Sequence, residues 1–476
     1  MNMNHRLKQA SIASAIIAST VIFTGCAKEE KAPALRIIHA SSDAPPVNVK
    51  LNKKVTVEDL DFAESTGFIP VKPGNRDIAV EAILPGDDLE VIKVDKFKFE
   101  KEQRYTVVAL DDTLNIGEFI AEESAATPAD NEVAISVLHA ATSVRGIDVG
   151  VYVTAPDAVI TGTDPNFSFD FTGQVDAGAV PADKYRIRIV AGGDTENPAY
   201  DSGEVDLSGF AGQKLLIVAV NTVNSATRDA SPVKLMAYTD SAQLELLDTD
   251  TTSAARVVHL SSTAGPVEVF ASSAELPGSP VEIIDSFDYT EGAPADKKSY
   301  LFVPAADDYI FTVSGAGAGF DNPAFITPEA LNLEKGKEYT AIAAGYVGMD
   351  PMFDILPTLD MNRSIVTQAS VKVVHGAPLA GTVDVFVTPA DEYTTAEILN
   401  GDAGKPTIDD FTFGTITDYV SLTPGEYDIR VVTDAGAGIA AIDIQDFPLA
   451  GGLVATVIAN EPGGAVADFG VVVLTN

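Results

Sequence analysis

Lys372-Val-Val-His375-Gly is an apolar strand that ends in a histidine, and close variants of it occur at three earlier points of the chain. Small residues rich in Ser, Thr and Pro follow each histidine. Successive histidines lie 100, 120 and 116 residues apart, and self-similarity on this scale indicates tandem copies of one domain. The three earlier variants are Arg36-Ile-Ile-His39-Ala, Ser136-Val-Leu-His139-Ala and Arg256-Val-Val-His259-Leu.

Three further landmarks recur in the same order after each histidine. They are a strand with alternating apolar positions, a strand entered through a proline-initiated turn, and an apolar strand near the end of the repeat. The alternating strands are Val47-Asn-Val-Lys50, Ile147-Asp-Val-Gly-Val-Tyr152, Val267-Glu-Val-Phe270 and Val383-Asp-Val-Phe-Val387. The proline-initiated turns begin at Pro73, Pro181, Pro304 and Pro424, and the late apolar strands begin at Tyr105, Leu215, Tyr339 and Val454.

This pattern predicts the fold class. Many short strands separated by turn residues are typical of a β-sandwich, and no stretch long enough for a major helix has 3.6-residue periodicity. We therefore expect an all-β chain of four tandem immunoglobulin-like β-sandwich domains. With a single cysteine in the chain, each domain must be held by apolar burial and not by disulfides. The expected domains are residues 34–132, 133–253, 254–368 and 369–476.

The landmarks resemble a family of bacterial secreted domains, domain of unknown function 4397. The resemblance rests on the Val-Val-His opening with its Val-Asp-Val strand, the Pro-Gly-x-Tyr strand entry and the Tyr-Thr-Val-Val-Ala strand. It covers nearly all of residues 34–476 and is loosest in the second copy, where Leu215-Leu216 replaces Tyr-Thr. It implies an immunoglobulin-like sandwich and no assigned activity. The core tryptophan and inter-sheet disulfide of antibody domains have no counterpart in this sequence.

Residues 1–25 are typical of a bacterial lipoprotein signal peptide. A basic start precedes an apolar segment, residues 10–23, that is too short to span a bilayer. Phe23-Thr24-Gly25-Cys26 then resembles the lipobox, which implies that a lipid is attached to Cys26 and that cleavage precedes it. Two or three acyl chains anchor a protein firmly without a transmembrane helix. Residues 26–33 form a short linker, and Ala27 favours the outer membrane, at its periplasmic face or at the cell surface.

The charge balance restricts the partners. The chain has 31 Lys and Arg against 69 Asp and Glu, a formal net charge of −38 at pH 7. Such a surface repels nucleic acid phosphates, so no nucleic acid partner is expected. Asp148, Glu268 and Asp384 recur in the alternating strands, where we expect them on the solvent face. Calcium binding by acidic loops is the alternative, but calcium needs several converging oxygen ligands and no metal site is assigned.

His39, His139, His259 and His375 are the candidates for chemistry. A histidine can be a metal ligand or a general base. We favour a structural role, in which each strand-end imidazole bonds the neighbouring loop backbone, because one histidine per domain cannot hold a metal alone. A residue present in every copy also suits a requirement of the fold. The chain contains neither a Gly-x-Ser-x-Gly elbow nor a His-Glu-x-x-His pair, so we expect no catalytic residue.

Three functional hypotheses follow. The first is a non-catalytic envelope lipoprotein whose repeats serve as a structural or adhesive module, bound to the membrane through its lipid and to an envelope polymer, glycan or protein by avidity. The second is a small-ligand or cation receptor that uses loops at one end of a sandwich, with calcium as the candidate cation. The third, an enzyme, is the least supported, and no cofactor is expected besides the lipid on Cys26.

Overall fold

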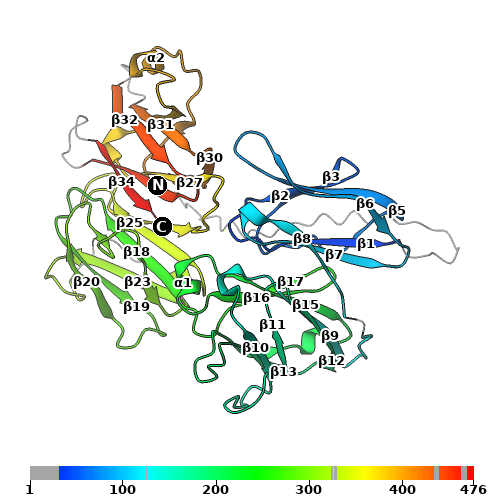
Figure 1. The fold of residues 1–476 in the computed structure, drawn as a ribbon. Helices are drawn as coiled ribbons and strands as arrows, with labels where there is room; N and C mark the ends of the chain where they lie inside the picture. The colour runs from blue at the N-terminus through cyan, green and yellow to red at the C-terminus, as the bar shows by residue number, and fades with distance from the viewer. Residues whose placement is uncertain are drawn as a thin grey trace, which may run out of the picture.

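The computed structural model describes residues 32–475, apart from residues 125, 323–324, 326–329, 434–438 and 462–468. The expected signal peptide and Cys26 lie outside these residues. Four groups of strands follow one another along the chain (Figure 1), and each group forms two small sheets packed face to face. The sandwich-type all-β fold predicted from the sequence is confirmed.

Every repeat has the same two sheets. In the first sheet, the strand that ends in the histidine pairs parallel with the late apolar strand, which places Ile38 opposite Val108 in repeat 1. In the second sheet, the alternating strand pairs antiparallel with the proline-entered strand, which places Val49 opposite Val80. Because side chains alternate along a strand, every second residue points into the core between the sheets.

Repeats 1 and 2 contain three four-stranded sheets and one five-stranded sheet. In repeat 1 the strand orders are β4-β1-β7-β8 and β3-β2-β5-β6, and in repeat 2 they are β12-β9-β15-β16-β17 and β11-β10-β13-β14. The strands of repeat 1 are β1 Ala34–His39, β2 Val47–Leu51, β3 Lys54–Leu60, β4 Ile69–Pro70, β5 Gly74–Ala82, β6 Leu89–Phe99, β7 Arg104–Leu110 and β8 Gly117–Ala121. Those of repeat 2 are β9 Glu132–His139, β10 Val149–Thr154, β11 Phe167–Phe169, β12 Gln174–Pro181, β13 Lys184–Ala191, β14 Tyr200–Asp206, β15 Lys214–Asn221, β16 Val233–Tyr238 and β17 Gln243–Leu246, with helix α1 at Ser225–Arg228.

Repeats 3 and 4 repeat the plan. Their orders are β21-β18-β25-β26, with β22 also on β18, and β20-β19-β23-β24 in repeat 3, then β30-β27-β33-β34 and β29-β28-β31-β32 in repeat 4. The strands of repeat 3 are β18 Ser253–His259, β19 Val267–Ser272, β20 Val281–Phe287, β21 Gly292–Ala293, β22 Leu301–Val303, β23 Ala306–Gly315, β24 Leu331–Leu333, β25 Glu338–Ala344 and β26 Asp354–Asp360. Those of repeat 4 are β27 Ala369–His375, β28 Val383–Pro389, β29 Ile408–Phe411, β30 Val420–Leu422, β31 Gly425–Thr433, β32 Ile439–Leu449, β33 Val454–Asn460 and β34 Gly470–Thr475, with helix α2 at Thr395–Leu399.

The repeats pack in pairs through the outer face of the first sheet. Along these strands, every second side chain points away from the core of its own repeat. These outward side chains form one apolar cluster between repeats 1 and 2 and a second between repeats 3 and 4. The same register positions meet in both pairs, so each pair has the isologous character of a two-fold interface. The first cluster includes Ile38 and Val108 with Leu138 and Val218, and the second includes Val258 and Ile342 with Val374 and Ile458.

Polar contacts join the two pairs. Between repeats 2 and 3, the Asn224 side chain donates to the Gly336 carbonyl at 2.7 Å. Between repeats 4 and 1, the Thr423 hydroxyl donates to the Pro85 carbonyl at 2.9 Å. Contacts therefore join each repeat to the next and repeat 4 to repeat 1, and Figure 1 shows the four sandwiches arranged around one another.

The described residues contain no helix that is both long and apolar enough to cross a bilayer.

Candidate functional site

Three of the four histidines share one arrangement at the end of the first strand. In repeat 1, the ring of His39 is fully buried, its Nε2 lies 3.0 Å from the Pro45 carbonyl, and its Nδ1 accepts from the Ser41 amide at 3.3 Å. His259 and His375 make the same two kinds of contact, with Nε2 at 2.8 Å and 2.9 Å from a carbonyl six residues later. An Nδ1 that accepts requires Nε2 to carry the proton. The imidazole is therefore neutral and ties the strand end to its loop.

His139 departs from this arrangement. Its Nδ1 accepts from the Ala141 amide at 3.2 Å, but its Nε2 has no partner within the described structure although the residue is only 2% exposed. The loop after His139 is two residues longer, because Val149 occupies the strand register of Val47, Val267 and Val383. The acceptor carbonyl of the other repeats is displaced as a result.

Burial sets the protonation of these rings. It lowers the pKa of His39 from 6.5 to about 4, an effect that exceeds the opposing contribution of the bond to Pro45. Burial also lowers the pKa of His139, His259 and His375. None of the four occurs in a cluster of metal-ligating side chains within the described part of the chain.

The acidic positions of the alternating strands behave differently from one another. Asp148 is exposed, and in the strand register it is Gly150, not Asp148, that occupies the position of Glu268 and Asp384. Glu268 is 3% exposed and accepts from the backbone amides of Gly317 and Gly319. The expectation of a solvent-facing carboxylate is therefore wrong for Glu268, because this side chain holds the glycine-rich loop.

Asp384, Asp409 and Asp410 have carboxylate oxygens within 4.8 Å of one another. Asp384 accepts from the Asp410 amide at 3.1 Å, and Asp410 has a positive φ of 51° at a bulge in β29. Asn48 bonds the Asp59 amide in the same way in repeat 1. The position of the Asp384 side chain is thus explained by its bond to the backbone at the bulge, which repeat 1 makes through Asn48.

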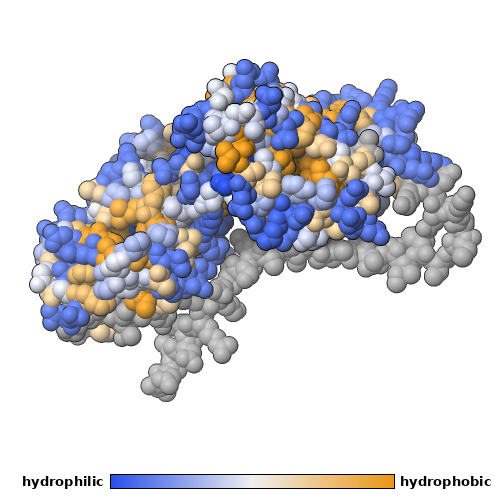
Figure 2. Space-filling model, turned by 90° about the horizontal axis from the view of Figure 1, so that it is seen from below, coloured by the Kyte–Doolittle hydropathy of each residue, from blue (hydrophilic) through white to orange (hydrophobic). Residues whose placement is uncertain are grey.

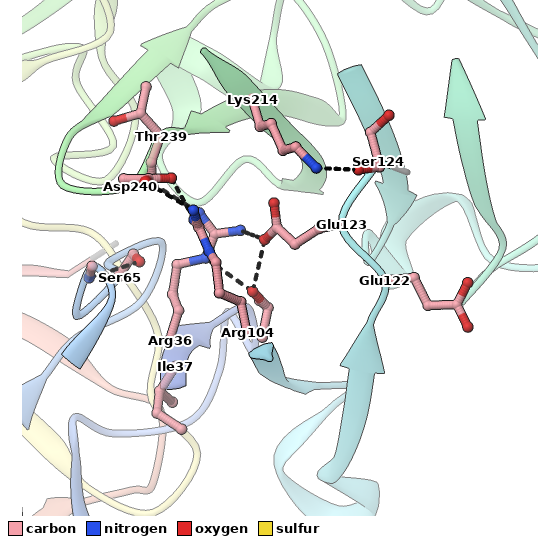
Figure 3. Close-up of polar contacts among 12 residues, drawn as sticks. Arg36, Ile37, Ser65, Arg104, Glu122, Glu123, Ser124, Lys214, Thr239 and Asp240 are labelled. Atoms are coloured by element: carbon pink, nitrogen blue, oxygen red, sulfur yellow. Dashed lines mark hydrogen bonds and ion pairs between the residues drawn. The ribbon is translucent and has the colours of Figure 1, made fainter. Parts of the chain in front are cut away.

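Buried charges lie where the repeats of a pair meet. Figure 3 shows Arg36, the first residue of the repeat motif, between repeats 1 and 2. Its guanidinium donates to the Thr239 carbonyl at 2.9 Å and pairs with Glu123 at 2.5 Å. Arg104 pairs with Asp240 across the same junction, but both of these side chains are exposed.

The junction of repeats 3 and 4 is built on Asp360. This carboxylate is fully buried, lies 3.1 Å from Arg256 Nη2 and 3.6 Å from Lys372 Nζ, and accepts from the Tyr300 hydroxyl at 2.7 Å. Arg256 and Lys372 occupy the register position of Arg36. The first position of the repeat motif thus supplies cations to both junctions, which is a role in assembly.

A large space lies inside repeat 3. A cavity of about 680 Å³ lies between its two sheets, and its walls are almost entirely apolar. A pocket of this size with apolar walls is the usual form of a small-molecule site. Phe302 and Leu359 line it while they remain 44% and 51% exposed, so the cavity reaches the surface. Figure 2 shows that hydrophobic patches interrupt the hydrophilic surface of the face that it displays.

Three alanines explain this space. Ala255, Ala271 and Ala341 line the cavity, and each stands at an inward position that carries Leu, Ile or Val in the other three repeats. Each exchange removes two or three carbons from the core. The counterparts of Ala255 are Leu35, Ile135 and Val371, those of Ala271 are Leu51, Val153 and Val387, and those of Ala341 are Val107, Ile217 and Val457.

The last strand of the second sheet also carries a smaller side chain in repeat 3 than in repeats 1 and 4. Leu331 stands opposite Tyr309, where repeats 1 and 4 have Phe97 and Phe447. In repeat 1, Phe97 packs against Phe99 and Tyr105, with ring centroids 4.9 Å and 5.0 Å away. In repeat 3 this position carries Leu331, and within the described residues β24 pairs with β23 at two positions.

Comparison with known sequences agrees with the repeat architecture. The sequence pattern of the family described as "Domain of unknown function (DUF4397)" matches residues 33–150 and 253–386, more than half of the chain. The chain belongs to this family. DUF4397 carries no assigned function in that description, so the match supports tandem domains of this type and leaves the activity open.

Other comparisons say little about function. No curated protein matches the chain. Among solved structures, one similar chain is a Bacteroides fragilis protein described as a candidate cell adhesion protein, at 8% identity and a TM-score of 0.13 over 47% of this chain and 97% of that one. No functional conclusion follows from so weak a likeness.

The cavity was not expected from the sequence of these DUF4397 repeats. The expected ligand site was a set of loops at a sandwich end, whereas the space lies between the sheets. A signal was nevertheless present, because Ala255 stands four residues before His259 where Leu35 precedes His39. Cys26 lies outside the described residues, and its lipidation stays a prediction.

Proposed function

We propose that this chain is a non-catalytic, lipid-anchored binding protein of the cell envelope that holds an apolar small molecule between the sheets of repeat 3. The cavity of about 680 Å³ carries this proposal. Cavities of about 150 Å³ lined by aliphatic side chains stay dry and bind benzene, so a larger space with similar walls suits a longer hydrocarbon. An empty cavity of this size also weakens the fold, which gives the ligand a second source of affinity.

The expected affinity is moderate. A ligand that buries about fifteen carbons gains about 12 kcal/mol at about 0.8 kcal/mol per carbon. Association costs at least about 4 kcal/mol, which leaves about 8 kcal/mol and a Kd of about 1 μM. The net charge of −38 repels anions, and the apolar walls disfavour a buried charge of either sign, so the favoured ligand is uncharged.

The envelope location supports this function. A lipid on Cys26 and the short linker after it would hold the repeats near a membrane, where uncharged apolar molecules partition. The anchor is tested by metabolic labelling with a fatty acid, in which Cys26→Ser abolishes incorporation. Protease added to intact cells distinguishes the cell surface, where the protein is degraded, from the periplasmic face, where it is protected.

Ligand binding is tested by titration of the chain carrying Cys26→Ser with the uncharged dye N-phenyl-1-naphthylamine. Saturable fluorescence enhancement is expected, and Ala255→Leu with Ala341→Val should weaken it at least tenfold because these changes restore the side chains of the other repeats. Leu114→Ser is the control, since Leu114 is 91% exposed in repeat 1 and lies away from the cavity. Equal dye affinity in the cavity-filling variant and the parent chain would refute the proposal.

A structural or adhesive role is the second candidate, and the closed arrangement of four repeats favours it. Contacts between all sequential neighbours, together with the Thr423 bond to Pro85, join the repeats into one body. Such a body presents its surfaces in fixed relative positions, which raises avidity for a polymer or a protein. Binding of the chain to envelope fractions or glycans in a pull-down is expected, and its absence would remove this candidate.

A further inference from the structure

A second cavity, in repeat 2, combines apolar walls with one uncommitted hydrogen-bond donor. It has a volume of about 300 Å³ and lies between the two sheets. His139, Asn166 and Tyr185 are the polar side chains among its lining residues. Asn166 accepts from the Val153 amide at 2.7 Å, and the Tyr185 hydroxyl donates to the Pro181 carbonyl at 2.9 Å. Of these three side chains, only that of His139 has a buried polar atom, Nε2, without a partner among the described residues.

The donor is Nε2 of His139. The Ala141 amide donates to Nδ1 at 3.2 Å, so the neutral ring carries its proton on Nε2. In repeats 1, 3 and 4 this atom bonds a loop carbonyl, but the longer loop of repeat 2 does not supply one. An unpaired buried donor costs about 1–3 kcal/mol, and an acceptor inside the cavity would remove that cost.

The cavity has a cause in the sequence. Val205 lines it and stands opposite Tyr185, at the register position of Phe97 and Phe447 in repeats 1 and 4. A valine in place of a phenylalanine leaves the end of the core unfilled. The volume is about twice that of a cavity that binds benzene, so a ligand of about ten heavy atoms fits.

We infer that repeat 2 binds an uncharged apolar molecule with a single hydrogen-bond acceptor, such as a ketone, aldehyde or ester carbonyl, which receives the Nε2 proton of His139. A carboxylate is disfavoured, because the site offers a neutral donor and no cation to balance a buried charge. This site is separate from the repeat 3 cavity and does not depend on the function proposed for it.

The test uses two probes of equal shape. Acetophenone has a carbonyl oxygen where α-methylstyrene has a methylene group, so the pair differs only in the acceptor. Both are titrated into the full chain carrying Ala255→Leu and Ala341→Val, which is expected to weaken any binding in repeat 3 at least tenfold. His139→Leu should lower the preference for acetophenone over α-methylstyrene about fivefold, the effect of one hydrogen bond of about 1 kcal/mol.

A spectroscopic signal locates the contact. In the chain labelled with ¹⁵N-histidine, acetophenone should shift the Nε2 resonance that disappears in His139→Leu, while the resonances of His39, His259 and His375 stay in place. α-Methylstyrene should leave the His139 proton without a hydrogen-bond shift. Acetophenone binding without a change at His139 would overturn the inference.

A variant that keeps His139 distinguishes loss of the cavity from loss of the folded state. Val205→Phe places the residue of repeats 1 and 4 in the cavity, and both probes should lose affinity at least tenfold while thermal unfolding shows that the chain is folded. Unchanged binding of acetophenone in Val205→Phe would also overturn the inference, because the probe would then occupy another site.

Discussion

The four histidines show that one residue can keep its position and differ in its surroundings. His39 is bonded at both nitrogens and buried, which fixes it in the neutral form. In His139, Nδ1 still accepts from a backbone amide, but Nε2 has no partner within the described structure. The same imidazole therefore bonds a loop carbonyl in three repeats, whereas in the fourth it lines a cavity and its Nε2 has no partner in the described part of the chain.

Burial of His39 makes stability depend on pH. Its pKa is about 4 in the folded chain against 6.5 as a free side chain. Above pH 6.5 the ring is neutral in both states, and as pH falls from 6.5 to 4 only the unfolded chain binds the proton. Stability contributed by the neutral ring is thus present above pH 6.5 and lost toward pH 4, by about 3 kcal/mol in all.

The measurement is urea unfolding at pH 7, 5.5 and 4 for the parent chain and for His39→Asn. Protonation of carboxylates affects both proteins, so the difference between their unfolding free energies isolates His39. We expect this difference to shrink by about 3 kcal/mol from pH 7 to pH 4. Parallel pH profiles of the two proteins would contradict the prediction.

Asp360 supports two cations that have little access to water. Replacing it by Leu leaves Arg256 and Lys372 buried without their carboxylate, which should lower the unfolding free energy by about 3–5 kcal/mol. Glu204→Gln is the matched control, because Glu204 pairs with Lys184 where both side chains are about half exposed, and it should change stability by less than about 1 kcal/mol. Similar effects from both changes, measured by urea unfolding, would show that burial does not control these pairs.

At the scale of the element, the strand that ends in the histidine has the same pairing in every repeat, but it packs into a filled core in repeat 1 and lines a cavity in repeat 3. Leu35 and Ala255 occupy the same inward position. Leu35→Ala should cost about 2–5 kcal/mol by opening a cavity in a filled core. Ala255→Leu should instead raise stability by about 0.5–2 kcal/mol by filling one. Equilibrium unfolding tests both, and destabilisation by Ala255→Leu would mean that the walls of the cavity cannot accept a larger side chain.

Much of the strand pattern could be predicted, since the parallel partners and the proline-entered strands lie where the repeated landmarks place them. The error at Asp148 has a physical reason: the sequence match of Ile147 with Val47 ignored a two-residue longer loop, which only the pairing of Val149 with Ala191 reveals. Glu268 was misplaced because alternation predicts a face of the sheet and not a loop folded over that face. The cavities depend on which inward side chains are small, and this comparison requires the register of all four repeats.

At the scale of the whole molecule, all four repeats bury both faces of their first sheet. Each has its own core, and each buries the outer face of its first sheet against a neighbour. The motif residues therefore serve two interfaces at once, with Ile37 inside repeat 1 and Ile38 facing repeat 2. This double burial explains why the first strand of each repeat is nearly continuously apolar.

The pairing of repeats predicts how fragments behave. Residues 253–475 keep the face-to-face pair and should be monomeric, whereas residues 253–368 expose Val258, Leu260 and Ile342, which are now almost fully buried. Because repeats 3 and 4 use the same positions for contact, the isolated repeat 3 should form an isologous dimer at micromolar concentration. Val258→Asp should return it to a monomer, since a carboxylate in that face would be buried without a partner. Sedimentation equilibrium measures each state, and a monomeric repeat 3 without the substitution would show that the outer face does not need a partner.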